Sequence, residues 1–539
     1  MSESSASMTG ATPARLRDRP ALVAFIVIVL AVALERLPTI GFAYLNVDES
    51  AYLLIGAALR HGAIPYIDII DRKPLGLYLI YAAADAIFSD AISGARILGG
   101  LCTILSAWIV VQIGRRFLRL SWTAATLAGV WFSVYAILYG GDAAQYNVFV
   151  MPFVAGAAFL VLRALDNMEG GAPPSVAEVG VSGLMLGLAM QVKYTPAFEA
   201  IGFGLLLIFV GWRNRAALGA HGIGALSRGI VLMILGGLLP TAIAMAVYWH
   251  LGHLDAFIFY NFTVNVVRTA TDYPGGLLVF RIGEVLLAVH PLLIFSVLYA
   301  ARGGAKAASA QGPAHKWVDA VLTIWLAAAA FGALVQRQPY MHYFYAIVPP
   351  LAIFSLAKLG AHGNFSKAAK RWLVVYTVAP IVGYAAGWTF ETWDHGSPML
   401  PREIAKTLRA ENVSSLYVFN AFGIIYYLSG LESPTKFTLP THLLRDLEAA
   451  SFQFDAVGEV QRILDSHPQV IVVTRPFAGN IAPNRVRLLE AELQASYCTW
   501  RIYEAGRDKV YLYRYEGIPG DSSRPCRSDA VGAASSAQR

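Results

Sequence analysis

Long apolar stretches recur along the chain as far as residue 389, and short loops rich in Lys and Arg separate them. An α-helix needs ~20 apolar residues to cross the hydrocarbon core of a bilayer. Hydrophobic residues make up 56% of the 539 positions and charged residues 14%, whereas a soluble domain carries about 25% charged residues. The pattern predicts a polytopic α-helical membrane protein and excludes both an ordinary cytoplasmic enzyme and a disordered scaffold.

Eleven spans are predicted, at residues 21–37, 96–114, 122–139, 147–165, 176–192, 195–212, 230–249, 282–300, 317–335, 343–359 and 372–389. Lys and Arg set their orientation, because cytoplasmic loops are enriched in these residues. Up to residue 401, seventeen basic residues fall on the side of the N-terminus and nine on the opposite side. Residues 1–20 are therefore expected in the cytoplasm, and an odd number of spans places the C-terminus in the periplasm of a bacterial inner-membrane protein.

Residues 75–90 are apolar but short, as in an interfacial or re-entrant helix. Counting them as a span would move the basic cluster at 115–119 to the outside and invert every later loop. We therefore expect residues 40–95 to form one periplasmic loop with two surface helices, at about 50–60 and 75–88. The transmembrane domain as a whole is expected over 21–394.

The pattern changes after residue 395. Residues 413–419, 468–474 and 510–515 are typical of strands, and 421–430 and 485–496 are typical of helices. Their alternation predicts a small periplasmic α/β domain over 395–518, followed by a disordered tail over 519–539. Two of the three cysteines, Cys498 and Cys526, fall on the oxidising side, where a disulfide is one open possibility.

The net charge of +7 has its origin in loops beside apolar segments. No stripe of Lys and Arg interleaved with aromatic residues is visible, so the bilayer is the expected partner and nucleic acid is not.

The strongest candidates for chemistry lie in the first loop. Asp48 and Glu49 follow the first span at an expected helix start, with Asp48 or Ser50 as the cap, and Asp71-Arg72-Lys73-Pro74 follows later. A carboxylate can accept a proton from a hydroxyl nucleophile, and a Lys can neutralise a phosphate as a point charge. The same residues also suit a capped interfacial helix with basic anchors, because surface charges are usually solvated.

This loop resembles the GT-C superfamily of membrane glycosyltransferases, most closely the branch that contains the protein O-mannosyltransferases and the lipid A aminoarabinose transferase. The resemblance rests on an Asp-Glu pair after the first span, a Gly-x-x-Pro-Tyr turn and a Lys-Pro-x-x-x-Tyr segment. The matching residues are Asp48, Glu49, Tyr52, Gly62, Pro65, Tyr66, Asp68, Asp71, Lys73, Pro74 and Tyr78. Leu75 departs from the family, which usually has a second proline there.

Three later segments match more loosely. Family members often carry an acid near the start of span 147–165, where this chain has Gln145 and Asn147 with Asp142 nearby; a polar turn explains them equally well. Lys193, in a short outside loop, opposes the positive-inside rule and matches a family Lys. Arg337 and His342 precede Pro349-Pro350 as in the family, although His342 also suits an interfacial imidazole.

The loop over 250–281 contains His250, His253 and Asp255, which are weak evidence for a metal. We prefer to interpret this loop as a lid that faces the lipid and covers the lipid chain of a glycosyl donor.

The resemblance implies an inverting glycosyltransferase that uses a polyprenyl-phosphate sugar. Asp48 would be the general base, while Lys73, Arg72, Lys193, Arg337 and His342 would bind the donor phosphate. The supporting or acceptor residues would be Glu49, Tyr52, Asp71, Asp142 and Asn147. The acceptor is left open between a lipid, a cell-envelope glycan and a protein; no metal site is assigned, and a divalent cation stays possible. The alternatives are a lipid-linked polysaccharide polymerase or ligase and, less favoured, a secondary transporter, which would place its charges mid-span between repeats.

Overall fold

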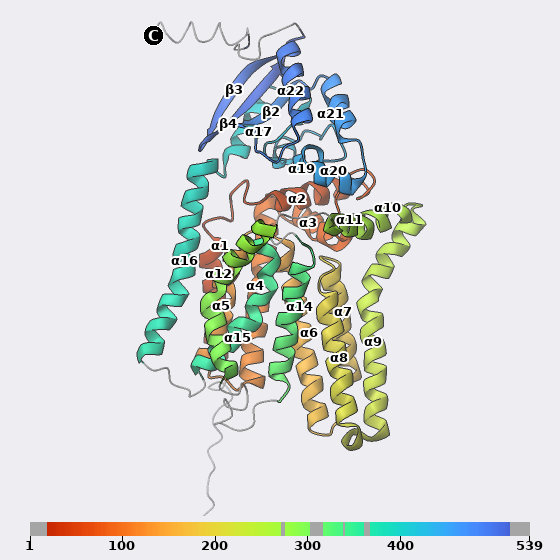
Figure 1. Cartoon of the computed structure of the whole chain (residues 1–539), viewed down its shortest axis with the longest axis vertical. Helices are drawn as coiled ribbons and strands as arrows, with labels where there is room; N and C mark the ends of the chain where they lie inside the picture. Colours follow the sequence, from red (N-terminus) through yellow and green to blue (C-terminus); the bar gives the residue numbers. More distant parts are fainter. Residues whose placement is uncertain are drawn as a thin grey trace, which may run out of the picture.

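The computed structural model describes residues 19–270, 275–301, 316–337, 340–360, 367–517 and 526. A bundle of long helices occupies the part of the chain before residue 396 (Figure 1). Its members are α1 (Arg19–Arg36), α4 (Ala91–Phe117), α5 (Trp122–Ala136), α6 (Tyr146–Glu169), α7 (Val176–Met190), α8 (Ala197–Arg213), α9 (Arg215–His250), α12 (Gly275–Ala301), α14 (Val318–Leu334), α15 (Val348–Gly360) and α16 (Lys367–His395). Each predicted span overlaps one of these helices.

Among the described residues, seven helical segments are long and apolar enough to cross a membrane. They confirm a multi-pass helical protein, and the count of eleven spans stays a prediction. The helices at the edge of the bundle expose large apolar side chains, such as Leu238 of α9 and Val378 of α16. A surface of large apolar side chains is unfavourable in water but stable in contact with lipid tails.

Helices α7 and α9 pack closely through small residues. A Cβ atom added at Gly183 would lie 2.1 Å from the backbone oxygen of Met233, and one at Gly187 would lie 2.6 Å from that of Gly236. Glycines allow two membrane helices to approach backbone to backbone. This contact holds the end of α7, from which the short loop with Lys193 emerges.

Two short helices of the first loop, α2 (Val47–Arg60) and α3 (Leu75–Ile87), lie across one end of the bundle, beneath the C-terminal segment (Figure 1). Both helices were predicted. The cap differs from the prediction: Asn46 accepts the backbone N–H of Asp48 at 2.8 Å, so α2 starts earlier and neither Asp48 nor Ser50 is its cap. The Asp48 carboxylate is consequently not used to close its own helix.

Residues 400–515, the C-terminal segment, form a four-stranded sheet of order β1-β2-β4-β3 with helices around it. Strands β1 (Leu416–Val418) and β2 (Val470–Arg475) are parallel, whereas β4 (Asp508–Tyr515) is antiparallel to both β2 and β3 (Tyr497–Ala505). The helices are α17 (Leu400–Ala410), α18 (Ile424–Ser429), α19 (Pro440–Leu444), α20 (Asp446–Phe452), α21 (Ala456–Asp465) and α22 (Pro483–Ser496). The three predicted strands and two predicted helices are present, whereas strand β3 and helices α17, α19, α20 and α21 were missed.

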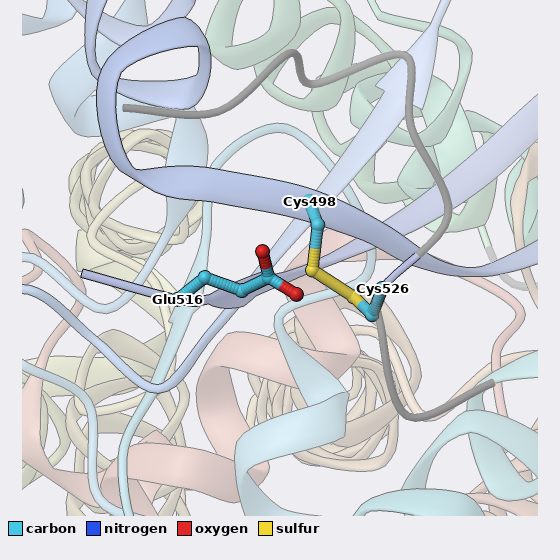
Figure 2. Close-up of side chains that lie close together, drawn as sticks. All are labelled: Cys498, Glu516 and Cys526. Atoms are coloured by element: carbon cyan, nitrogen blue, oxygen red, sulfur yellow. A yellow bond between two sulfur atoms is a disulfide. The ribbon is translucent and has the colours of Figure 1, made fainter. Parts of the chain in front are cut away.

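A disulfide joins Cys498 at the start of β3 to Cys526, and Glu516 lies beside it (Figure 2). Apart from Cys526, the predicted disordered tail falls outside the described residues, as does most of the predicted cytoplasmic N-terminus.

Candidate functional site

A cavity of about 410 Å³ opens where the first loop, the α7–α8 loop and the segment around α11 (Val264–Ala270) meet. Four basic side chains line it, namely those of Arg72, Lys73, Lys193 and Arg268. Apolar groups such as Met190, Phe262 and Val266 complete its wall. A pocket lined by several cations together with apolar side chains suits an amphiphilic anion.

Lys73 is 7% exposed, and its backbone is fixed by two tyrosines of the resemblance motif. The Tyr66 hydroxyl donates to the Lys73 carbonyl at 2.6 Å, and the Lys73 N–H donates to the Tyr78 hydroxyl at 3.2 Å. Tyr78 in turn donates to Asp71 at 2.9 Å, so Asp71 supports this arrangement rather than the cavity. Tyr66 adopts φ +69°, a conformation that non-glycine residues rarely keep without compensation.

The Lys73 ammonium lies 5.8 Å from the ring centre of Tyr52 and 5.5 Å from that of Tyr146. None of the described residues forms an ion pair with it. A buried ammonium held mainly by aromatic faces retains most of its capacity to bind an anion. The hydroxyl of Tyr52 is likewise buried without a hydrogen-bond partner within the described ranges.

Lys193 stands beside the same aromatic wall. Its ammonium donates to Gln336 at 2.8 Å and lies 4.4 Å from the ring centre of Tyr146 and 4.6 Å from that of Tyr343. Burial, and then repulsion from Lys73 and Arg72, lowers the pKa of Lys193 well below its ordinary value. An anion entering the cavity would relieve that repulsion.

Asp48, in the first turn of α2, has a side chain 28% exposed and lies 3.9 Å from Nε2 of His342. Burial raises the pKa of Asp48, but attraction from Lys73 and the other nearby cations outweighs it, so the net pKa is lowered. Asp48 is therefore a carboxylate at neutral pH.

Glu49 has a different environment from its neighbour. Both carboxylate oxygens accept from Arg96, at 2.9 and 2.6 Å, and one also accepts the Ala144 N–H at 3.0 Å. Arg96 also donates to backbone carbonyls just after α1. Glu49 is thus occupied in joining α2, α4 and the loop before α6, which is a supporting role.

Of the eleven predicted residues, Arg72, Lys73 and Lys193 line the cavity and the other eight, Asp48 and His342 included, do not. Three of these eight have other surroundings. Asp142 accepts a hydrogen bond from Tyr384 of α16 at 2.7 Å, and burial raises its pKa. Asn147 donates to the carbonyl of His342 and so supports that residue. Arg337 is exposed with φ +54°, and its neighbour Gln336 lines the cavity instead.

The residues that sequence reasoning missed come from distant segments. Asn261 and Asn265 line the cavity beside Arg268; Asn265 donates to the Arg72 carbonyl at 3.2 Å. Glu448 of α20 binds both arginines of the cavity. In its described part, the loop proposed as a lid thus forms one wall of the cavity. The sequence signal that could have indicated this wall is the pair Asn265 and Arg268, three positions apart in α11.

Within the described ranges, one group of three residues has the spacing of metal ligands: Cys498, Glu516 and Cys526. Because the two sulfurs are bonded to each other, they are not thiolate ligands (Figure 2). His250, His253 and Asp255 do not form such a group.

A family model described as dolichyl-phosphate-mannose-protein mannosyltransferase matches residues 71–246. The chain is similar to ArnT from Cupriavidus metallidurans bound to undecaprenyl phosphate, with a TM-score of 0.55 and 14% identity, over 93% of this chain and 98% of that one. It is also similar to the oligosaccharyltransferase AglB from Archaeoglobus fulgidus in complex with an inhibitory peptide and a dolichol-phosphate, with a TM-score of 0.53 and 12% identity, over 92% and 74%. No curated protein sequence matches the chain.

Proposed function

We propose that this membrane protein, whose resemblance to the GT-C glycosyltransferases is confirmed, is an inverting glycosyltransferase that takes its sugar from a polyprenyl-phosphate donor. The observation that carries the proposal is one ionised carboxylate, Asp48, which lies outside the cavity wall but close enough to be attracted by three of the four cations that line it. Both structural relatives are described with a polyprenyl-type phosphate bound. The cations of this chain suit the phosphate of such a lipid, and the apolar wall suits the start of its chain.

Two parts of the site act in the transfer: Asp48 acts on the acceptor, and the cations of the cavity act on the donor phosphate. The acceptor hydroxyl oxygen attacks the anomeric carbon on the face opposite the phosphate, the bond from that carbon to the phosphate oxygen breaks, and Asp48 takes the hydroxyl proton. The leaving lipid phosphate gains one negative charge as the bond breaks. Lys73 and Lys193 stabilise it, because a compact ammonium held in place interacts strongly with developing charge.

The lowered pKa of Asp48 belongs to the protein without donor. The cations that lower it are the ones that a bound phosphate would partly neutralise. Donor binding would therefore raise the basicity of Asp48 towards the value that general base catalysis favours. His342 lies 3.9 Å from the carboxylate, and Asn147 donates a hydrogen bond to the His342 carbonyl, so that the imidazole is held beside Asp48.

The active groups are proposed to face the periplasm. The distribution of Lys and Arg supports this orientation. The disulfide of the C-terminal segment also supports it, since such bonds persist in oxidising compartments. The acceptor, whether lipid, envelope glycan or protein, is an extracytoplasmic hydroxyl compound.

The test compares the envelope lipids and glycans of a deletion strain with those of the same strain complemented by wild type, Asp48→Asn or Asp68→Asn. Asp68 is an exposed carboxylate of the same loop that accepts one backbone N–H, which an Asn can also accept. We expect wild type and Asp68→Asn to restore the missing glycosylated product. Asp48→Asn should lower its rate of formation by roughly 10²–10⁴, and near-wild-type formation would refute the base assignment.

A further inference from the structure

Glu448 connects the C-terminal segment to the wall of the cavity. Glu448 is 6% exposed, and its carboxylate accepts from Arg72 at 2.7 Å and from two nitrogens of Arg268 at 3.2 and 3.0 Å. Burial raises its pKa, but the two arginines outweigh burial and hold the pKa well below its ordinary range. One buried anion is therefore shared between two of the four cations that line the cavity.

The same helix packs against the arginine from a second direction. The Arg72 guanidinium lies 5.9 Å from the ring centre of Phe452, one turn beyond Glu448 on α20. The carbonyl of Arg72 is held by Asn265. Glu448 uses Nη1 of Arg72 and Nε and Nη2 of Arg268, and within the described ranges no partner is seen for Nη2 of Arg72 or Nη1 of Arg268. Each guanidinium group thus uses some of its N–H donors to bind Glu448 and has others available for a ligand.

We propose that Glu448 is a positioning residue that orients these two arginines and sets, by its charge, how tightly the site holds its lipid phosphate product. The proposal rests on the proposed function. A sugar-linked lipid phosphate is a diester with one negative charge, whereas the lipid phosphate that leaves is a monoester with up to two. Four uncompensated cations would hold the monoester strongly and slow its release.

The charges give this role a numerical signature. Replacing Glu448 by Gln adds one net positive charge beside the phosphate, and its attraction scales with ligand charge. The factor by which product affinity rises should therefore be about the square of the factor for the donor. We expect the donor to bind roughly threefold more tightly and the product roughly tenfold more tightly. If Glu448 only oriented the arginines and its charge played no part, its replacement by Gln would leave them disordered, and the affinities for donor and product would both fall.

The experiment uses the purified full-length protein in lipid nanodiscs with undecaprenyl phosphate as the probe, measured by direct binding and as a product inhibitor. Glu459→Gln is the matched control, because Glu459 is an acid of the same segment paired with Arg462. We expect tighter binding of the probe and a lower kcat for Glu448→Gln, with Glu459→Gln like wild type. Unchanged or weaker binding of the probe to a folded Glu448→Gln would overturn the proposal.

A double variant covers the case in which Glu448→Gln does not fold. Glu448→Gln with Arg268→Met removes both members of one pair, so the net charge equals that of wild type and Arg72 alone is left without its carboxylate. Its affinity for the probe should lie within about threefold of wild type; a clear gain in affinity would refute the charge argument. Wild-type protein that does not bind the probe at all would instead refute the proposed donor.

Discussion

The pair of acids at the start of α2 allows the assignment of the base to be tested by stability as well as by activity. The side chain of Glu49 forms three hydrogen bonds, two to Arg96 and one to the Ala144 N–H, while the Asp48 carboxylate lies 3.9 Å from Nε2 of His342. Glu49→Gln would leave the guanidinium of Arg96, 1% exposed, without its counter-ion. Breaking a buried pair in this way costs about 3–5 kcal/mol.

We therefore expect Glu49→Gln to lose stability and Asp48→Asn to lose turnover. The free energy of unfolding in detergent, measured by a reversible denaturant titration or ranked by thermal unfolding, should fall by about 3–5 kcal/mol for Glu49→Gln and change little for Asp48→Asn. Adding Arg96→Met to Glu49→Gln should recover part of the loss, since residues in contact are not additive. A Glu49→Gln protein as stable as wild type but inactive would show that Glu49, and not its neighbour, takes part in the chemistry.

The remaining predictions concern the cations and the topology. Lys73→Ala should weaken donor binding and slow turnover while Lys73→Arg recovers only part, because the fork of Arg differs in shape from an ammonium; full activity in Lys73→Ala with normal membrane insertion would make the residue an anchor. Because the pKa of Lys193 is lowered, kcat/KM for the donor should fall with rising pH well before an ordinary Lys titrates, and Lys193→Arg should abolish that fall whereas Lys406→Arg, on the surface, should not. A C-terminal alkaline phosphatase fusion should be active and a green fluorescent protein fusion dark; the reverse would mean a miscounted span, first of all at residues 75–90.

Local patterns predicted the elements of the fold that depend on nearby residues. Apolar stretches located the bundle helices, and the motif of the first loop brought Asp48 and Lys73 to the same site. Strand β3 escaped detection because an irregularity between Thr499 and Arg501 breaks its alternation, so that Arg501 and Ile502 are both exposed at the edge of the sheet.

Contacts between distant segments left no local pattern to read. Glu448 meets Arg268 across 180 positions and Arg72 across 376. Arg337 was predicted at the cavity from its order in a motif, but its left-handed backbone leaves it exposed and brings no contact with the wall. Order along the chain specifies which residues follow one another, whereas the direction of each side chain depends on the turn that carries it.

The cap of α2 has a consequence for how the site recovers between reaction cycles. Asn46 closes the helix, so the Asp48 carboxylate stands free at the end where the helix dipole favours negative charge. If Asp48 accepts the hydroxyl proton as proposed, it becomes an acid stronger than an ordinary carboxylic acid, in contact with solvent through its exposed part. Proton loss to water is then favourable at neutral pH, and the resting form is restored without a second group dedicated to carrying the proton away.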